Sequence, residues 1–234
     1  IWYEAHIKTP THEIYGHYLP LIPFPALGHN KYIGWGLTMS KVDDMDFYAE
    51  TFSKDKKKVL YKNSWVKIKA YTEIINIKGE KPIEIEIKLT PHGPIMDYVL
   101  DKKNISMKWS YYEPDNLALD TLYLAERAKS WEEFKHAFSF GAAPGLHIAY
   151  ADSSGNIGSL VYGKIPNREH LLFSDRILNG ANGENEYSYY KYSQNPKLFN
   201  PKSGQIVLAN ARQNIPEKIG GFWSPTDRFD TISK

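Results

Sequence analysis

Cysteine is absent from the 234 residues of this sequence. Its absence excludes disulfide bonds, thiolate nucleophiles and cysteine-based zinc sites, but leaves the cellular compartment open. Charge of one sign is not in excess either, because 29 Lys and Arg residues are matched by 27 Asp and Glu residues. This balance gives no signature of a nucleic-acid partner. No apolar run approaches the roughly 20 residues that a transmembrane helix requires, so we expect no membrane span.

Local catalytic motifs are missing as well. The sequence has neither a G-x-S-x-G nucleophile elbow nor an H-E-x-x-H zinc motif. His92 stands beside Gly93 and Pro94, where a histidine more often hydrogen-bonds the backbone of a turn than acts in catalysis. The sequence begins at Ile1 rather than at methionine, which suggests a piece of a longer chain. These local motifs alone describe a β-rich domain without an assigned role.

What the sequence has in abundance is aromatic residues, at 14%, including 17 Tyr and 6 Trp. They predict a large β-rich body and argue against disorder. Ser130 and Glu133 form a capping-box pattern, which predicts a helix whose Trp131, Phe134 and Phe138 line one buried face. Strict alternation predicts a strand over residues 83–87. A turn at residues 152–156 predicts a hairpin of strands 147–151 and 157–162, and a last strand is predicted over residues 205–209.

Residues 28–50 (GHNKYIGWGLTMSKVDDMDFYAE) combine a turn, a glycine-rich strand and an acidic cluster. Gly34 and Gly36 inside a strand usually mark a bulge or a closely approached backbone. The carboxylates of Asp43, Asp44 and Asp46 repel one another unless they are solvated or bridged by a cation. Two interpretations follow: a solvated acidic loop, or a site for a hard cation, because Ca²⁺ prefers carboxylate and carbonyl oxygens.

Residues 25–50 resemble the penicillin acylase family of N-terminal-nucleophile hydrolases, which has a G-H-N turn, a W-G-x-T strand and a D-x-x-D cluster. Further matches follow the family's order along nearly the whole chain: residues 1–6, 90–95, 150–158, 200–210 and Arg228. The resemblance implies an α+β fold, the β-rich αββα four-layer sandwich. It also implies that residues 1–234 are one fragment of a β-subunit core, incomplete at both ends.

The resemblance implies a mechanism that explains the missing motifs. Family members use a Ser, Thr or Cys at the first residue of the β-subunit, which self-cleavage of a precursor sets free. The α-amino group of that residue acts as the base, with an ordinary pKa of about 7.7–8.0. In the family this nucleophile lies before the segment that matches Ile1–His6, so we expect it to be absent here. The chain alone is therefore expected to be inactive.

The resemblance also assigns site residues. It maps the oxyanion hole to the backbone N–H of Met39 and the side-chain amide of Asn210, and it maps the orienting arginine to Arg228. Leu27 and Leu37 map to the acyl pocket, and the region of Phe24 passes close to it. Core packing beside a turn explains Phe24 and Leu27 nearly as well. Apolar side chains at these positions suit an aliphatic or aromatic acyl group.

Calcium is the cofactor that the resemblance implies. Its ligands map to the side chains of Asp43 and Asp46 and to the backbone carbonyl of Met45. A later carbonyl falls near Asp175, and Glu217 replaces the last carboxylate of the family pattern. One further ligand comes from the α-chain, so the resemblance implies an incomplete site in this chain.

The parent protein is thus expected to be an amidase that cleaves an acyl group from penicillins, acyl-homoserine lactones or related amides. Its expected partners are the small-molecule substrate and the α-subunit of the same precursor, in the periplasm or outside the cell. One alternative is a calcium-dependent carbohydrate-binding or adhesion module, in which Tyr187, Tyr189, Tyr190 and Tyr192 form an exposed platform. The other is a catalytically dead scaffold of the same fold.

Overall fold

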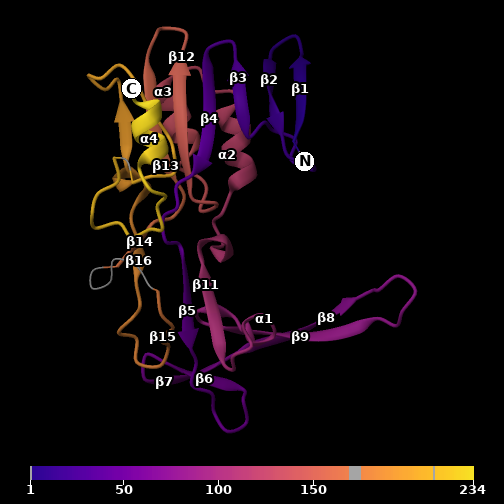
Figure 1. Ribbon diagram of the computed structural model, residues 1–234. Helices are drawn as coiled ribbons and strands as arrows, with labels where there is room; N and C mark the ends of the chain where they lie inside the picture. Colours follow the sequence, from indigo (N-terminus) through magenta and orange to yellow (C-terminus); the bar gives the residue numbers. More distant parts are fainter. Residues whose placement is uncertain (1, 169–174, 213) are drawn as a thin grey trace. The chain divides into compact units, whose positions relative to one another are not determined.

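The computed structural model describes residues 2–168, 175–212 and 214–234 (Figure 1). The chain divides into two compact units: unit 1 contains residues 1–44, 113–173 and 188–234, and unit 2 contains residues 45–112 and 174–187. Strands outnumber helices in the described residues, as predicted. No helix in these ranges is long and apolar enough to cross a membrane.

Unit 1 contains a seven-stranded sheet in which every neighbouring pair is antiparallel (Figure 1). Its strands, in spatial order, are β1 (Tyr3–Lys8), β2 (Glu13–Tyr18), β3 (Leu27–Asn30), β4 (Ile33–Met39), β12 (Leu146–Asp152), β13 (Ile157–Tyr162) and β17 (Lys197–Phe199). Residues 152–156 turn the chain between β12 and β13, and Gly155 has φ 85°, in the left-handed region that favours glycine. The predicted hairpin is confirmed.

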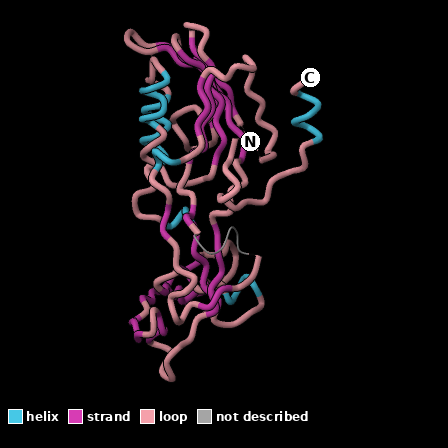
Figure 2. Tube along the Cα trace, turned by 90° about the vertical axis from the view of Figure 1, so that its left-hand side faces the viewer, coloured by secondary structure: helices cyan, strands magenta, loops and turns pink. Residues whose placement is uncertain are grey.

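The core of unit 1 lies between one face of this sheet and the helices α2 (Ala118–Ala125) and α3 (Trp131–Ala137). Figure 2 shows these helices along one side of the strands, and the C-terminal helix α4 (Asp227–Ile232) on the other side. Side chains alternate along β4, so Ile33 and Trp35 enter this core while the intervening residues face the α4 side. The sheet therefore offers a second face with different residues.

Helix α3 begins as the sequence predicts. The hydroxyl of Ser130 accepts a hydrogen bond from the backbone N–H of Glu133, at 3.3 Å. The carboxylate of Glu133 accepts from the N–H of Lys129 at 2.9 Å. In a capping box it would accept from the N–H of Ser130, so the return bond reaches the residue before the cap. Trp131, Phe134 and Phe138 are buried, as expected.

Unit 2 is built around β5 (Met45–Ala49), which pairs with β11 (Ile105–Trp109) and β15 (Leu178–Asn179). Two hairpins complete it: β6 (Lys58–Tyr61) with β7 (Ser64–Lys67), and β8 (Lys69–Ile75) with β9 (Ile83–Thr90). The predicted strand at 83–87 is confirmed within β9. Its remaining short elements are β10 (Gly93–Pro94), α1 (Asp97–Leu100) and η1 (Ser110–Tyr112), whereas β14 (Pro166–Asn167), β16 (Ser188–Tyr189) and η2 (Tyr192–Gln194) belong to unit 1.

Two predictions of local structure are wrong. Residues 205–209 do not form a strand, because they have no ladder partner among the described strands and follow a turn at Gly204. The glycines of β4 do not mark a close backbone approach either. A Cβ on Gly36 would meet no atom within 4 Å, whereas one on Gly28 would lie 2.3 Å from the carbonyl oxygen of Tyr15. The tight contact is therefore at Gly28, which pairs with Gly16 of β2.

Candidate active site

The side-chain amide of Asn210 lies against the end of β4 in unit 1. Its Nδ2 donates to the Oγ1 of Thr38 at 2.6 Å and to the backbone carbonyl oxygen of Met39 at 2.9 Å. Asn210 has φ 59°, in the left-handed region that asparagine tolerates better than most residues. This backbone turns the amide toward β4, so the structure brings together two of the predicted site residues, Met39 and Asn210.

Arg228, the third predicted catalytic residue, fixes the direction of that amide. From α4, its Nη2 donates to the Oδ1 of Asn210 and to the carbonyl oxygen of Ala209, each at 2.7 Å. A guanidinium has donors and no acceptor, so the oxygen of the amide must face Arg228. The nitrogen must then face Thr38 and Met39, which orients Asn210 as a donor toward the end of β4.

The chain after β4 is held by two other segments of unit 1. The backbone N–H of Ser40 donates to the carbonyl oxygen of Gly145 at 3.0 Å, and the indole of Trp223 donates to the carbonyl oxygen of Ser40 at 3.1 Å. The N–H of Ser224 donates to the carbonyl oxygen of Asn210 at 2.9 Å. These bonds fix the backbone on both sides of the contact between Asn210 and β4. The side chain of Met39 is half exposed, and Asn210 is bonded to the backbone of Met39.

Sequence reasoning assigned no role to Thr38 or to His147, which lies directly opposite Thr38 on β12. Facing residues of an antiparallel pair share one face of the sheet, so His147 shares the face from which Thr38 reaches Asn210. His147 is buried, and burial lowers its pKa to about 4, so its ring is neutral at ordinary pH. Thr38 belongs to the W-G-x-T motif, which could have pointed to it from the sequence, whereas His147 belongs to no such motif.

The predicted acyl-pocket residues lie on β3, on β4 and in the segment just before β3. Leu37 alternates with Thr38 and packs against the core cluster that includes Ala125 of α2. The ring of Phe24 meets the ring of Tyr123 on α2, edge to face, with centroids 5.4 Å apart. Leu27 begins β3 and is partly buried. Phe24 and Leu37 therefore both lie toward the helical side of unit 1.

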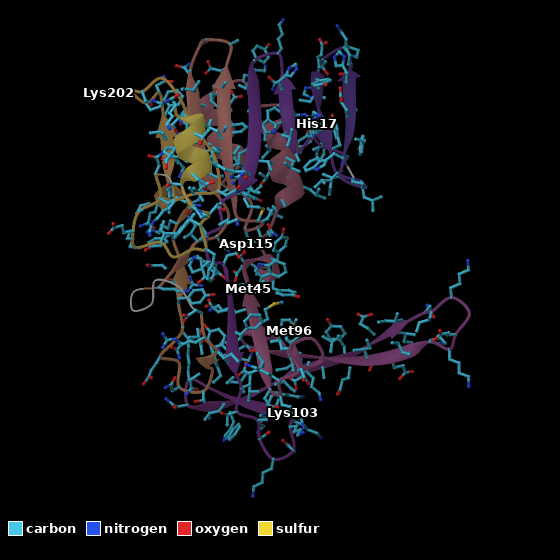
Figure 3. All side chains as sticks on the ribbon, in the orientation of Figure 1. His17, Met45, Met96, Lys103, Asp115 and Lys202 are labelled. Atoms are coloured by element: carbon cyan, nitrogen blue, oxygen red, sulfur yellow. The ribbon has the colours of Figure 1, made fainter. Side chains whose placement is uncertain are left out.

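The acidic cluster is not a solvated loop, because Asp43 is 3% exposed and Asp46 is 1% exposed. Asp43, in unit 1, has its Oδ2 3.4 Å from the guanidinium of the buried Arg168, which also donates to the carbonyl oxygen of Asp43 at 2.9 Å. Asp46 lies on β5 in unit 2. Strand β5 begins at Met45, which is labelled in Figure 3. Burial therefore contradicts the simpler of the two sequence interpretations.

The other predicted metal ligands are at the surface. Asp175 in unit 2 is exposed and pairs with the exposed Arg176, with 3.5 Å between Oδ1 and Nε, and Glu217 in unit 1 is exposed. The structure gathers no three His, Asp or Glu side chains into a metal-binding group anywhere in residues 2–168, 175–212 and 214–234. As donors, the buried carboxylates of Asp43 and Asp46 and the carbonyl of Met45 are of the type that suits a hard cation.

Known proteins share this sequence pattern. The family model described as penicillin amidase matches residues 1–234. The acyl-homoserine lactone acylase QuiP of Pseudomonas fluorescens is 24% identical, over 99% of this chain and 30% of its own length. The penicillin G acylase of Escherichia coli is 29% identical, over 90% of this chain and 26% of its own length. The chain thus spans less than a third of each of these relatives.

The fold is shared as well. The solved structure of a thermostable penicillin G acylase from Alcaligenes faecalis matches with a TM-score of 0.81 and 25% sequence identity, covering 95% of this chain and 41% of that one. This likeness confirms the predicted fold class, that of the N-terminal-nucleophile hydrolases.

Proposed function

Because the chain belongs to the penicillin amidase family, we propose that its parent protein hydrolyses an amide bond and releases an acyl group. The observation that carries the proposal is the meeting of Asn210, Met39 and Arg228 at the end of β4. The family match alone would allow an inactive relative. A donor amide held in one orientation, by contrast, can stabilise the oxyanion that forms during acyl transfer. Penicillins, acyl-homoserine lactones and related amides are the proposed substrates.

The proposed nucleophile is an N-terminal Ser, Thr or Cys of the mature protein that is not among residues 1–234. Its hydroxyl or thiol attacks the substrate carbonyl, and its α-amino group takes the proton and then passes it to the departing amine. Water then cleaves the acyl-enzyme. In both steps negative charge develops on the carbonyl oxygen, where the backbone N–H of Met39 and the Nδ2 of Asn210 are the proposed donors.

The geometry adds one requirement to this scheme. Both hydrogens of the Asn210 Nδ2 are already engaged, one by Thr38 and one by the carbonyl of Met39. An incoming oxyanion must therefore share or displace one of these acceptors. Arg228 keeps the amide from turning over while this happens, because it bonds the oxygen end. Arg228 is thus proposed as a positioning residue, while Asn210 touches the reacting atom.

The acyl group is proposed to be apolar and to lie near Phe24, Leu27 and Leu37. Calcium is proposed as a structural ion, bound by Asp43, Asp46 and the carbonyl of Met45, with Asp175 and Glu217 as weaker candidates. When bound it would neutralise carboxylate charge and would take no part in the reaction. We also propose the α-subunit of the same precursor as a partner, and a location in the periplasm or outside the cell.

The binding-module alternative is less well supported. Its predicted platform requires four exposed tyrosines, but all four are only partly exposed. Each ring also has a lysine ammonium within 5.3 Å of its centroid. Tyr192 packs against the core of unit 1, and Tyr190 packs against its second apolar cluster. Rings covered in this way do not offer a flat face to a sugar. The dead-scaffold alternative is decided by the nucleophile.

The test uses the protein expressed from its complete gene. Intact mass and N-terminal sequencing should show two chains, the larger beginning with Ser, Thr or Cys, and the protein should hydrolyse phenylacetyl or alkanoyl amides. Asn210→Ala should lower kcat by about 10²–10³, the usual loss for one oxyanion donor. Asn76→Ala, at an exposed position of unit 2, is the matched control. A single uncleaved chain without activity would support the dead scaffold instead.

A further inference from the structure

His92, for which the proposed reaction has no use, is buried in unit 2 between two carboxylates. Its Nδ1 lies 2.8 Å from the Oε1 of Glu50, and its Nε2 lies 2.7 Å from the Oε1 of Glu186. His92 is 4% exposed and Glu50 is 5% exposed, and Glu186 is partly buried. A neutral imidazole can donate from only one ring nitrogen. With both partners ionised, two contacts at these distances need the doubly protonated, cationic ring.

The groups around this trio favour the charged ring. The ring of Tyr48 stacks on His92 with centroids 3.9 Å apart and planes 8° from parallel, and Tyr61 meets it edge to face. The hydroxyl of Ser106 on β11 donates to Glu50 at 2.6 Å, and the N–H of His92 donates to the hydroxyl of Thr90 at 3.1 Å. These contacts hold the ring between its two carboxylate partners.

Further polar groups face Glu186 from β6 and β11. The hydroxyl of Tyr61 donates to its Oε2 at 3.3 Å, and the ammonium of Lys108 lies 3.6 Å from the same oxygen. The charge of Lys62 also acts on Glu186. Lys62 is exposed, so water screens its charge. Among the less exposed groups, His92 and Lys108 balance the two carboxylates when His92 is protonated. Without that proton, the buried cluster keeps an unbalanced negative charge, which is costly away from water.

The cluster joins a loop to the strands of unit 2. Glu186 lies in residues 180–187, between β15 and β16, while Glu50 directly follows β5. The N–H of Gly180 donates to the carbonyl oxygen of Ala49 at 3.1 Å, and a Cβ on Gly180 would lie only 2.8 Å from the Oε2 of Glu50. The same Cβ would lie 3.1 Å from the Cε1 of His92. The start of the loop is thus closed directly over the histidine.

We propose that Glu50, His92 and Glu186 form a pH-dependent clamp, which holds the loop of residues 180–187 on unit 2 while His92 is protonated and loosens it when His92 is neutral. Glu186 is the loop side chain that holds His92 by a hydrogen bond. Loss of the proton removes one of the two charged hydrogen bonds, and the bond to the loop is the less buried of the two.

The direction of the pH effect follows from the three groups. Burial alone would lower the pKa of His92, but its hydrogen bonds to Glu186 and Glu50 outweigh burial and raise it above the ordinary value near 6.5. Burial alone would raise the pKa of Glu50 and of Glu186, but the bond from His92 in each case helps to lower it. The clamp is therefore complete from mildly acidic pH up to the ordinary histidine pKa, and is lost as pH rises through the raised pKa of His92.

Two exchange measurements on the complete protein test this proposal. Hydrogen–deuterium exchange at the imidazole Cε1, followed by mass spectrometry against pH, reports the titration of each histidine. His92 should titrate above an unperturbed histidine, and His147 well below it. Amide exchange in residues 180–187, expressed as protection, should then fall about tenfold per pH unit between the ordinary and raised pKa values, because one proton is released on opening.

Glu186→Gln provides the decisive variant, since it keeps the shape of the side chain and removes its charge. We expect the His92 titration to move toward the ordinary value and loop protection to lose its pH dependence. Glu184→Gln, an exposed position in the same loop, should leave both unchanged. The proposal is overturned if His92 titrates at or below the ordinary value, or if both variants behave alike. Neither measurement depends on amidase activity.

Discussion

At the residue scale, Asn210 shows how an amide acquires a single orientation. The amide group of an isolated asparagine can turn by 180°, which exchanges the places of its donor nitrogen and its acceptor oxygen. Here the guanidinium of Arg228 selects the oxygen, while the hydroxyl of Thr38 and the carbonyl of Met39 select the nitrogen. In the proposed reaction, this fixed donor direction means that little reorganisation is needed when charge develops on the substrate. Thr38 is the member of this set whose contribution can be removed most cleanly.

Thr38→Val replaces the hydroxyl with a methyl group of similar size. Asn210 would then lose one of its two acceptors while keeping its bonds to Met39 and Arg228. We expect kcat of the complete protein to fall about tenfold with KM little changed, because one hydrogen bond contributes roughly 0.5–1.5 kcal/mol. Thr38→Ser should restore activity. Equal kcat in Thr38→Val and the wild type would exclude a positioning role for this hydroxyl.

At the element scale, much of the molecule is predictable from local patterns. The helix that begins after Ser130, the hairpin around Gly155 and the strand within β9 follow from capping, turn chemistry and alternation. Residues 205–209 contain an apolar run of strand type but form no strand, because a strand exists only when a neighbour pairs with it. The site shows the same limit. Motif resemblance predicted Met39, Asn210 and Arg228 as site residues, and the structure brings them together, whereas His147 and the partners of His92 depend on strand register and long-range packing.

Glycine in β3 and β4 gives a matched pair for a stability test. In Gly28→Ala the new Cβ would lie 2.3 Å from the carbonyl oxygen of Tyr15 and 2.8 Å from the Cα of Gly16, so backbone must shift. In Gly36→Ala the Cβ meets open space. We expect thermal or urea unfolding to show a loss of about 1–3 kcal/mol for Gly28→Ala, and little change or a slight gain for Gly36→Ala. Similar losses in both variants would contradict this packing of β2 against β3.

At the scale of the whole molecule, buried charge is the feature that demands an explanation. Unit 1 contains the buried pair of Asp43 and Arg168, and unit 2 contains the buried carboxylates of Asp46 and Glu50. A buried carboxylate is tolerated when it is paired, hydrogen-bonded or bound to a metal ion. Glu50 is paired with His92 and Asp43 with Arg168. We propose that a cation adds to the stabilisation that protein groups already give the acidic stretch around Asp46.

Calcium should therefore raise the stability of the complete protein. A ligand that binds only the folded state stabilises it by about 2.7 kcal/mol at a concentration one hundred times its Kd, so Tm should fall after treatment with EDTA and recover with Ca²⁺. Asp46→Asn should abolish the response, because it removes a proposed ligand. Asp44→Asn removes the same charge from the same acidic stretch at a position outside the proposed ligand set, so it should keep the response. If Asp44→Asn and Asp46→Asn lose it equally, calcium acts on the general charge of the stretch. If Tm is unaffected by calcium in the wild type, the burial of Asp46 must be balanced by protein groups alone.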